Sequence, residues 1–140
     1  MTPDFNEDLA FSSYAFSQEQ LETIESIILK DLVESGAHSI LLIDLAGNII
    51  AKADNGECDH DLYSLAALAS ANFAAVDTMA RLIGESEFSL LFHKGEKESI
   101  HFSKVKKDFL LISIFGTRVS LGLLRLKVAE AIDKISAIWD

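Results

Sequence analysis

The segment Asp61–Ile83 carries so few charges that it constrains the fold more than any other part of the chain. Its apolar residues recur every three or four positions, as on one buried face of an α-helix: Leu62, Ala66, Ala69, Phe73, Val76, Ala80 and Ile83. A second stripe carries only small side chains: Ala67, Ser70, Ala71, Ala74 and Thr78. Because surface helices normally have a charged outer face, we predict a helix packed on its own sheet and on a partner.

The ends of this predicted helix carry start and stop signals. Asp59 is placed to cap the N-terminus, and Asp61 adds a negative charge to the first turn, where backbone N–H groups are free. Arg81 suits the last turn, and Gly84 can end the helix. The charges therefore lie at the ends, which leaves the body of the helix available for packing on two sides.

Composition limits the classes of partner. The chain has 140 residues, one proline and 49% hydrophobic residues, which suits a single domain with a real core. A net charge of −10 argues against nucleic acid and against an anionic membrane surface, so we expect protein partners. Cys58 is the only cysteine, there is no signal segment, and no apolar run approaches the roughly 20 residues of a membrane span. These features predict a cytoplasmic protein without membrane insertion.

Residues 1–16 lack a clear period and are interpreted as an N-terminal tail, either disordered or docked through its aromatic residues. The domain proper is predicted to span residues 17–140. Ser17 followed by Gln20 is a capping-box pattern that starts a first helix. An apolar stripe then continues up to Gly36, through Leu21, Ile24, Ile28 and Leu32.

Short segments rich in β-branched or aromatic residues predict five strands. They are Ser39–Asp44, Asn48–Ala53, Phe88–His93, Glu98–Ser103 and Phe109–Phe115, and a final helix follows from about Ser120 to Trp139. The first two strands form a hairpin in which Gly47 and Asn48 can take positive φ. The fold class is α+β: helix, two strands, helix, three strands, helix, with helices on the faces of a five-stranded antiparallel sheet.

The predicted sheet leaves one edge unprotected. The last strand is almost wholly apolar, so we place it mid-sheet beside the first, which leaves the second and third strands at the edges. The third strand carries Phe88, Leu90 and Phe92 and has no proline, inward charge or bulge to block pairing. This edge and the small-residue stripe both predict a second copy of the chain, as a homodimer.

Five segments in this order resemble the roadblock superfamily, over about His38 to Ile135: LLIDLAGNIIAKA, LAALASANFAAVDTMARLIGE, FSLLFHKGE, FLLISIFG and SLGLLRLKVAEAIDKI. The resemblance is to bacterial members that act in gliding motility and cell polarity. It implies a dimer with one continuous sheet, two central helices side by side, and a Ras-like small GTPase of the MglA type docked on them. Such proteins stimulate GTP hydrolysis by rearranging the GTPase and need not donate an arginine finger.

The resemblance carries over five candidate contact residues: Leu65, Leu68, Ser70, Ala71 and Asn72. Together with the small-residue stripe and the unprotected edge, they define the predicted partner and dimer interface. It consists of Leu65, Ala67, Leu68, Ser70, Ala71, Asn72, Ala74, Thr78, Phe88, Leu90 and Phe92.

No catalytic, cofactor or metal site is predicted. Consecutive positions in Cys58-Asp59-His60-Asp61 cannot converge on one ion, and the sequence has no phosphate loop, GxSxG elbow or HExxH helix. His93 and His101 could face each other across a hairpin, although an ordinary strand role is favoured. Arg118 is the best placed arginine for a finger, but a helix-end or solvent-exposed role is favoured for all three.

Three functional classes remain open from the sequence. The resemblance favours a regulator of a small GTPase over a roadblock scaffold that tethers larger complexes. A small-molecule sensor or enzyme that uses the hydrophobic interior is the third class. The first two need the same dimer and the same exposed helical face, so the residues alone do not separate them.

Overall fold

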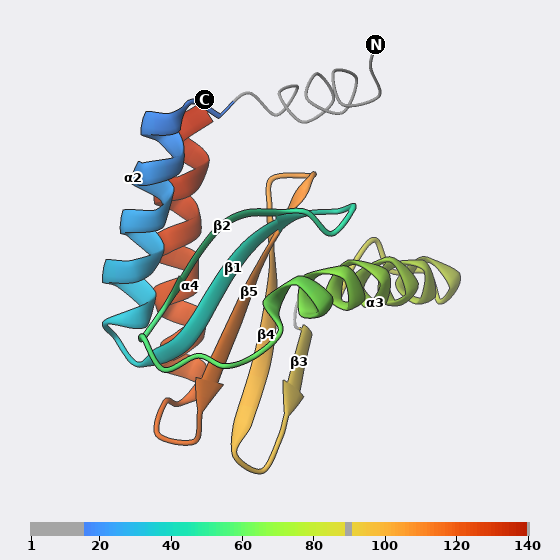
Figure 1. The fold of residues 1–140 in the computed structure, drawn as a ribbon. Helices are drawn as coiled ribbons and strands as arrows, with labels where there is room; N and C mark the ends of the chain where they lie inside the picture. The colour runs from blue at the N-terminus through green and yellow to red at the C-terminus, as the bar shows by residue number, and fades with distance from the viewer. Residues whose placement is uncertain (1–15, 89–90, 140) are drawn as a thin grey trace.

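The computed structural model describes residues 16–88 and 91–139, which form a five-stranded antiparallel sheet with helices on both faces (Figure 1). The element order is as predicted. The elements are α2 (Gln18–Ile28), the π-helical η1 (Leu29–Val33), β1 (Ala37–Asp44), β2 (Ile49–Asp54), α3 (Leu62–Leu82), β3 (Leu91–Lys94), β4 (Glu98–Val105), β5 (Phe109–Gly116), α4 (Leu121–Ser136) and the 3-10 turn η2 (Ala137–Trp139).

The strands lie in the order β2-β1-β5-β4-β3. This confirms that the last strand pairs with the first and that the second and third strands form the edges. β5 is central, and every residue from Phe109 to Phe115 is buried. Its register places Leu111 opposite Leu42 of β1 and opposite Ser103 of β4. An apolar strand in this position needs covering on both faces, because both of its rows of side chains leave water.

α2 and α4 lie side by side on one face of the sheet (Figure 1). The predicted capping box starts α2: Gln20 N donates to Ser17 Oγ at 3.1 Å, and Ser17 N donates to Gln20 Oε1 at 2.8 Å. The η1 segment that follows α2 is joined to α4 at the surface by Lys134 Nζ and Asp31 Oδ2, 2.7 Å apart. Residues from both helices and the sheet form one buried cluster, which includes Ile24, Ile28, Leu32, Ile40, Leu42, Leu111, Leu124, Val128 and Ile135.

α3 crosses the opposite face of the sheet (Figure 1). It packs on alternate residues of the same strands, including Leu41, Ile43, Leu110 and Ile112, all of which are fully buried. Alternation of side chains along a strand sends neighbouring residues to opposite faces, so the two apolar clusters share the backbone of β1 and β5. In residues 16–88 and 91–139, no helix is long and apolar enough to cross a bilayer.

The β1–β2 turn is built around one buried carboxylate. Asp44 accepts hydrogen bonds from Ala46 N at 3.0 Å, Asn48 N at 2.8 Å and Asn48 Nδ2 at 3.0 Å. Gly47 takes a φ of +93°, as predicted, but Asn48 does not take a positive φ. Its side chain instead binds Asp44, which fixes the turn with a single left-handed residue.

The third strand differs from its predicted bounds. β3 begins at Leu91 rather than at Phe88, which lies outside any strand, and Leu90 lies outside the described residues. The strand pairs only with β4, from Leu91 opposite Phe102 to Lys94 opposite Ser99. The predicted tail also falls outside the description except for Phe16, whose ring packs 5.7 Å from that of Phe109.

Candidate interaction surface on α3 and β3

Asp61 caps the N-terminus of α3, whereas the spacing predicted Asp59 as the cap. The Asp61 carboxylate accepts from Ser64 N at 3.1 Å and from Ser64 Oγ at 2.7 Å. These hydrogen bonds stabilise the charged form and hold the pKa of Asp61 below its usual value. The cap therefore lies two residues later than predicted, at the residue whose side chain reaches the free N–H groups.

The inner stripe of α3 is only partly buried. Leu62, Ala66, Ala69 and Ala80 are buried, whereas Phe73 and Val76 are half-buried. Ile83 was predicted to face the sheet, but 70% of it is exposed. The physical reason is geometrical: α3 crosses the strands, so its C-terminal turns extend beyond the sheet (Figure 1). A helical period predicts a face but not the point at which the underlying sheet ends.

The small-residue stripe has two parts. Ala71, Ala74 and Thr78 are exposed, and nothing in residues 16–88 and 91–139 covers them. Ala67 is also exposed and Ser70 is half-buried, and both lie beside the β1–β2 turn: a Cβ atom on Gly47 would be 3.2 Å from Ala67 Cα and 3.1 Å from Ser70 Oγ. Their small size therefore serves a close approach within the chain, and a partner role for these two residues stays a prediction.

Large hydrophobic side chains also lie on the exposed side of α3. The exposed fractions are 69% for Leu68, 52% for Met79 and 79% for Leu82. Of these, only Leu68 was predicted. Leu68, Ala75, Met79 and Leu82 are seven, four and three residues apart, which is the spacing of one helical stripe. That spacing is present in the sequence and could have predicted this exposed apolar stripe.

The remaining predicted contact residues surround this stripe. Leu65 is half-buried, Asn72 is exposed and Phe88 is 38% exposed. Phe92 stacks on Phe115, with ring centroids 5.9 Å apart, so its side chain belongs to the cluster beneath α2 and α4. Only the backbone of β3 is then available for pairing along this edge. The surface formed by α3 residues Leu68, Ala71, Asn72, Ala74, Ala75, Thr78, Met79, Leu82 and Ile83, with β3 beside it, is called the α3 surface below.

The two strand histidines do not face each other. His101 lies opposite Phe92, and His93 lies opposite Ile100. Because neighbouring residues in a strand point to opposite faces, His101 lies beneath α4 and is buried. His93 lies on the other face, edge-on to the ring of Phe102 at 5.9 Å. The favoured strand role is therefore correct for His93, while His101 occupies an unusual polar position in the core.

His60 of the Cys-Asp-His-Asp motif takes part in a cluster that the sequence did not reveal. His38 Nδ1 lies 2.7 Å from Glu98 Oε1, and His60 Nε2 lies 3.1 Å from Glu98 Oε2. The hydrogen bond from His38, followed by the nearby charge of His60, lowers the pKa of Glu98. The cluster ties the segment before α3 to the first residues of β1 and β4. Among the described residues, no three His, Cys, Asp or Glu side chains are arranged to hold a metal ion.

None of the arginines lies at a catalytic cluster. Arg81 pairs with Asp77 one turn earlier on α3. Arg118 is exposed in the turn between β5 and α4, and Arg125 is exposed on α4. The α3 surface thus presents apolar and small side chains, which suit docking of another protein rather than chemistry on a small substrate.

Comparisons with known proteins agree with the fold. The structure of MglB from Myxococcus xanthus is 36% identical, covers 84% of this chain and 94% of its own, and superposes with a TM-score of 0.74. The gliding protein MglB from Thermus thermophilus is 27% identical, with coverage of 88% and 93% and a TM-score of 0.80. A structure described as MglB with a tetrameric arrangement is also 27% identical, with coverage of 88% and 92% and a TM-score of 0.81.

A family model matches the part of the chain that contains all five strands and α3. Residues 26–115 match the Roadblock/LC7 domain, from the last turn of α2 to the end of β5. The matched range includes all of α3 and the β1–β2 turn that rests on it. The chain therefore belongs to the Roadblock/LC7 family and resembles its MglB members.

Proposed function

We propose that this protein is a homodimeric, non-catalytic regulator of a Ras-like small GTPase of the MglA type, acting as its GTPase-activating partner in bacterial motility or cell polarity. The observation that carries the proposal is the exposed apolar side of α3. Leu68, Met79 and Leu82 are each more than half exposed on a 21-residue helix. A row of large apolar side chains in water is costly, and burial on another protein would relieve that cost.

The second copy of the chain would bind along β3 and the neighbouring part of α3. β3 is an edge strand with four residues, and β4 occupies only one side of it. Pairing of two such edges would extend the sheet and place two α3 helices beside each other, since α3 lies over the same end of the sheet (Figure 1). The similarity to an MglB described as tetrameric supports self-association.

The GTPase would dock across the paired α3 helices in the cytoplasm. A regulator that binds the GTP-loaded form more tightly shifts the GTPase towards the conformation it recognises. Stimulation in this way needs no arginine finger, which is consistent with Arg81 being held by Asp77 on the same helix. Small residues such as Ala71 and Ala74 permit a close backbone approach.

A scaffold without GTPase stimulation is the second candidate. Arg81 is paired with Asp77 on its own helix, and this favours binding alone as much as regulation. A scaffold would hold both nucleotide states of a partner equally, or would bind another protein on the same surface.

One experiment separates the two functions. The GTP hydrolysis rate of the Ras-like GTPase from the same source is measured with and without this protein, and calorimetry compares binding of the GTP-loaded and GDP-loaded forms. We expect faster hydrolysis and tighter binding to the GTP-loaded form. Equal affinities with an unchanged hydrolysis rate would contradict the regulatory function and leave a scaffold.

A further inference from the structure

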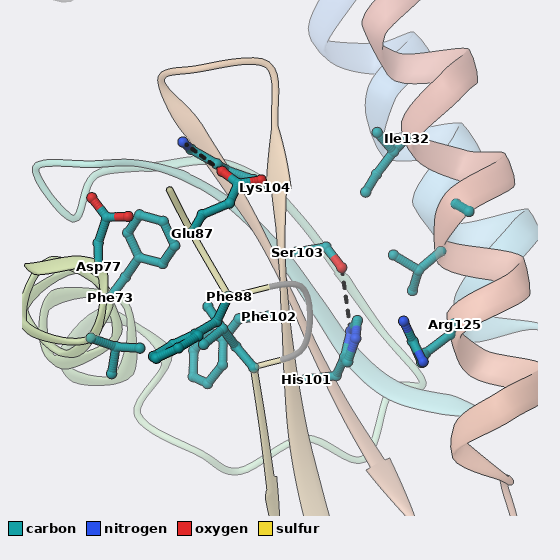
Figure 2. A pocket seen from close by; sticks show the side chains of 14 residues that line it. Phe73, Asp77, Glu87, Phe88, His101, Phe102, Ser103, Lys104, Arg125 and Ile132 are labelled. Carbon is teal, nitrogen blue, oxygen red and sulfur yellow. Dashed lines mark hydrogen bonds and ion pairs between the residues drawn. The ribbon is translucent and has the colours of Figure 1, made fainter. Parts of the chain in front are cut away.

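A cavity of about 290 Å³ extends from Phe73 and Asp77 of α3, past the edge of β4, to the side of α4 (Figure 2). On the α4 side its wall is formed by Arg125, Val128 and Ile132, which lie on one face of the helix. His101 and Ser103 of β4 line the same end. The volume is near the lower limit of known ligand sites, about 300 Å³, so only a small molecule would fit.

His101 is buried without a good hydrogen-bond partner. It is 3% exposed, and the only bond of its ring is a long one of 3.5 Å, between Nδ1 and Ser103 Oγ. Within residues 16–88 and 91–139, its other ring nitrogen has no partner. Across the strand pair from His101, the Ser113 hydroxyl is also buried and unpartnered. Buried polar groups normally have hydrogen-bond partners. This end of the cavity therefore offers unsatisfied polar groups to a polar ligand.

Arg125 supplies a positive charge at the same end. Figure 2 shows its guanidinium directed towards the His101 ring. In the described part of the chain, Arg125 forms no hydrogen bond or ion pair. Burial, followed by the charge of Arg125, lowers the pKa of His101 to about 4, so the ring is neutral at pH 7. An anion between the two groups would pair the arginine and accept a hydrogen bond from the ring.

The charges around the cavity select the kind of anion. Lys104 is already paired with Glu87, with 3.5 Å between Nζ and Oε2. Glu87 and Asp77 line the end of the cavity away from Arg125, and they are paired with Lys104 and Arg81, so Arg125 carries the one unpaired charge among the described residues that line the cavity. The wall beyond Arg125 is apolar. A single planar carboxylate matches one guanidinium fork, whereas a phosphate dianion would meet too little positive charge.

We propose that this cavity binds a small organic monocarboxylate, with its carboxylate held by Arg125 and His101 and its aliphatic part against Val128 and Ile132. The carboxylate subsite, formed by Arg125 and His101, contains no residue of the α3 surface, although the far end of the cavity is lined by Phe73 and Asp77 of α3 and by Leu91 of β3. Binding of the carboxylate does not require a GTPase.

Binding should strengthen as pH falls. A bound carboxylate stabilises the charged form of His101 and raises its pKa, so binding takes up protons. The groups that face the ring are Arg125 from α4, Ser113 from β5 and Ser103 on its own strand, and of these only Arg125 is charged. The affinity should therefore rise from pH 7.5 to pH 5.5, while the carboxylate ligand itself stays ionised.

The test is an NMR titration of the full chain with isobutyrate, and separately with inorganic phosphate, at constant ionic strength. We expect saturable shifts of His101, Ser103 and Val128 with isobutyrate and at least tenfold weaker binding of phosphate. Arg125→Gln should weaken isobutyrate binding at least tenfold. Arg118→Gln is the matched control, because it removes an exposed arginine outside the cavity and should leave the affinity unchanged.

A second variant tests the cavity itself. Ala129 lies on the cavity wall and is exposed, so Ala129→Phe should fill the space without disturbing the core, and should abolish binding while the circular dichroism spectrum stays native. Non-saturable shifts would overturn the proposal. Equal responses to isobutyrate and phosphate, or isobutyrate binding that survives Arg125→Gln and Ala129→Phe, would also overturn it.

Discussion

The two faces of the sheet are covered to very different extents. On one face, α2 and α4 lie together and bury Ile28 and Ile135 completely. On the other, α3 crosses alone, and Leu82 and Ile83 remain 79% and 70% exposed. α4 also exposes Leu123 and Leu126, but these two residues lie within one turn near the start of the helix and form no longer stripe. The α2 and α4 face thus has a continuous buried core, whereas the α3 face leaves large apolar side chains in water, as the proposed binding of a partner requires.

The largest effect is expected from a charge placed on the inner side of α3. Ala66 packs against the sheet and is 0% exposed. Ala66→Arg therefore buries an unpaired charge, which should lower the free energy of unfolding by about 3–5 kcal/mol. We expect loss of the folded state in circular dichroism and urea denaturation. A urea transition like that of the wild type would show that this side of α3 is accessible to water.

The same substitution on the outer side should spare the fold. Ala71→Arg lies on the α3 surface, so we expect a native circular dichroism spectrum and an affinity at least about a hundredfold lower for the second copy, for the GTPase, or for both, roughly 3 kcal/mol. Analytical ultracentrifugation and GTPase binding measure the loss. A well-folded dimer that still stimulates the GTPase at the wild-type rate would place partners elsewhere.

The α4 face can be tested by pH. The pKa of His101 is about 4 when folded and about 6.5 when unfolded, so between these values the unfolded chain binds the extra proton and acid destabilises the fold. The free energy of unfolding should fall by about 2 kcal/mol between pH 7 and pH 5 from this group alone. Urea denaturation of the wild type and of His101→Gln checks this, because the variant should lose that part of the pH dependence. An identical pH dependence in both would mean that water reaches His101.

The smallest effect concerns the contact between the β1–β2 turn and α3. Gly47→Ala combines a positive φ with contacts of 3.1–3.2 Å to Ser70 and Ala67. Gly56→Ala is the matched control, with φ +85° and no atom within 4 Å of the added Cβ. Backbone strain should cost about 1 kcal/mol in both variants. A larger loss of stability in Gly47→Ala than in Gly56→Ala would measure the close contact between the turn and α3. Equal losses would show that the added Cβ of residue 47 does not clash with α3.

Local patterns predicted the fold well, because strand alternation and helical spacing depend on residues close in sequence. The apolarity of Phe109–Phe115 was enough to place β5 in the centre of the sheet. The errors concern tertiary geometry. Nothing near Ile83 in the sequence indicates that the sheet ends before it, and the approach of Gly47 to Ser70 joins distant segments.

The alanines of α3 predicted its outer side, and Ala71 and Ala74 are exposed, while their contact with a partner stays a prediction. Met79 and Leu82 belong to neither of the two predicted stripes, so their exposure was not predicted. The cluster of His38, His60 and Glu98 joins three segments that are far apart in sequence, so no local motif could have predicted it.

The self-association of the wild-type chain tests most directly whether the α3 face needs a partner. Light scattering at micromolar concentration measures its mass in solution without any other protein. We predict at least twice the 15.4 kDa of the single chain. A mass that stays at 15.4 kDa across the concentration range would contradict the proposal that β3 and α3 bind a second copy.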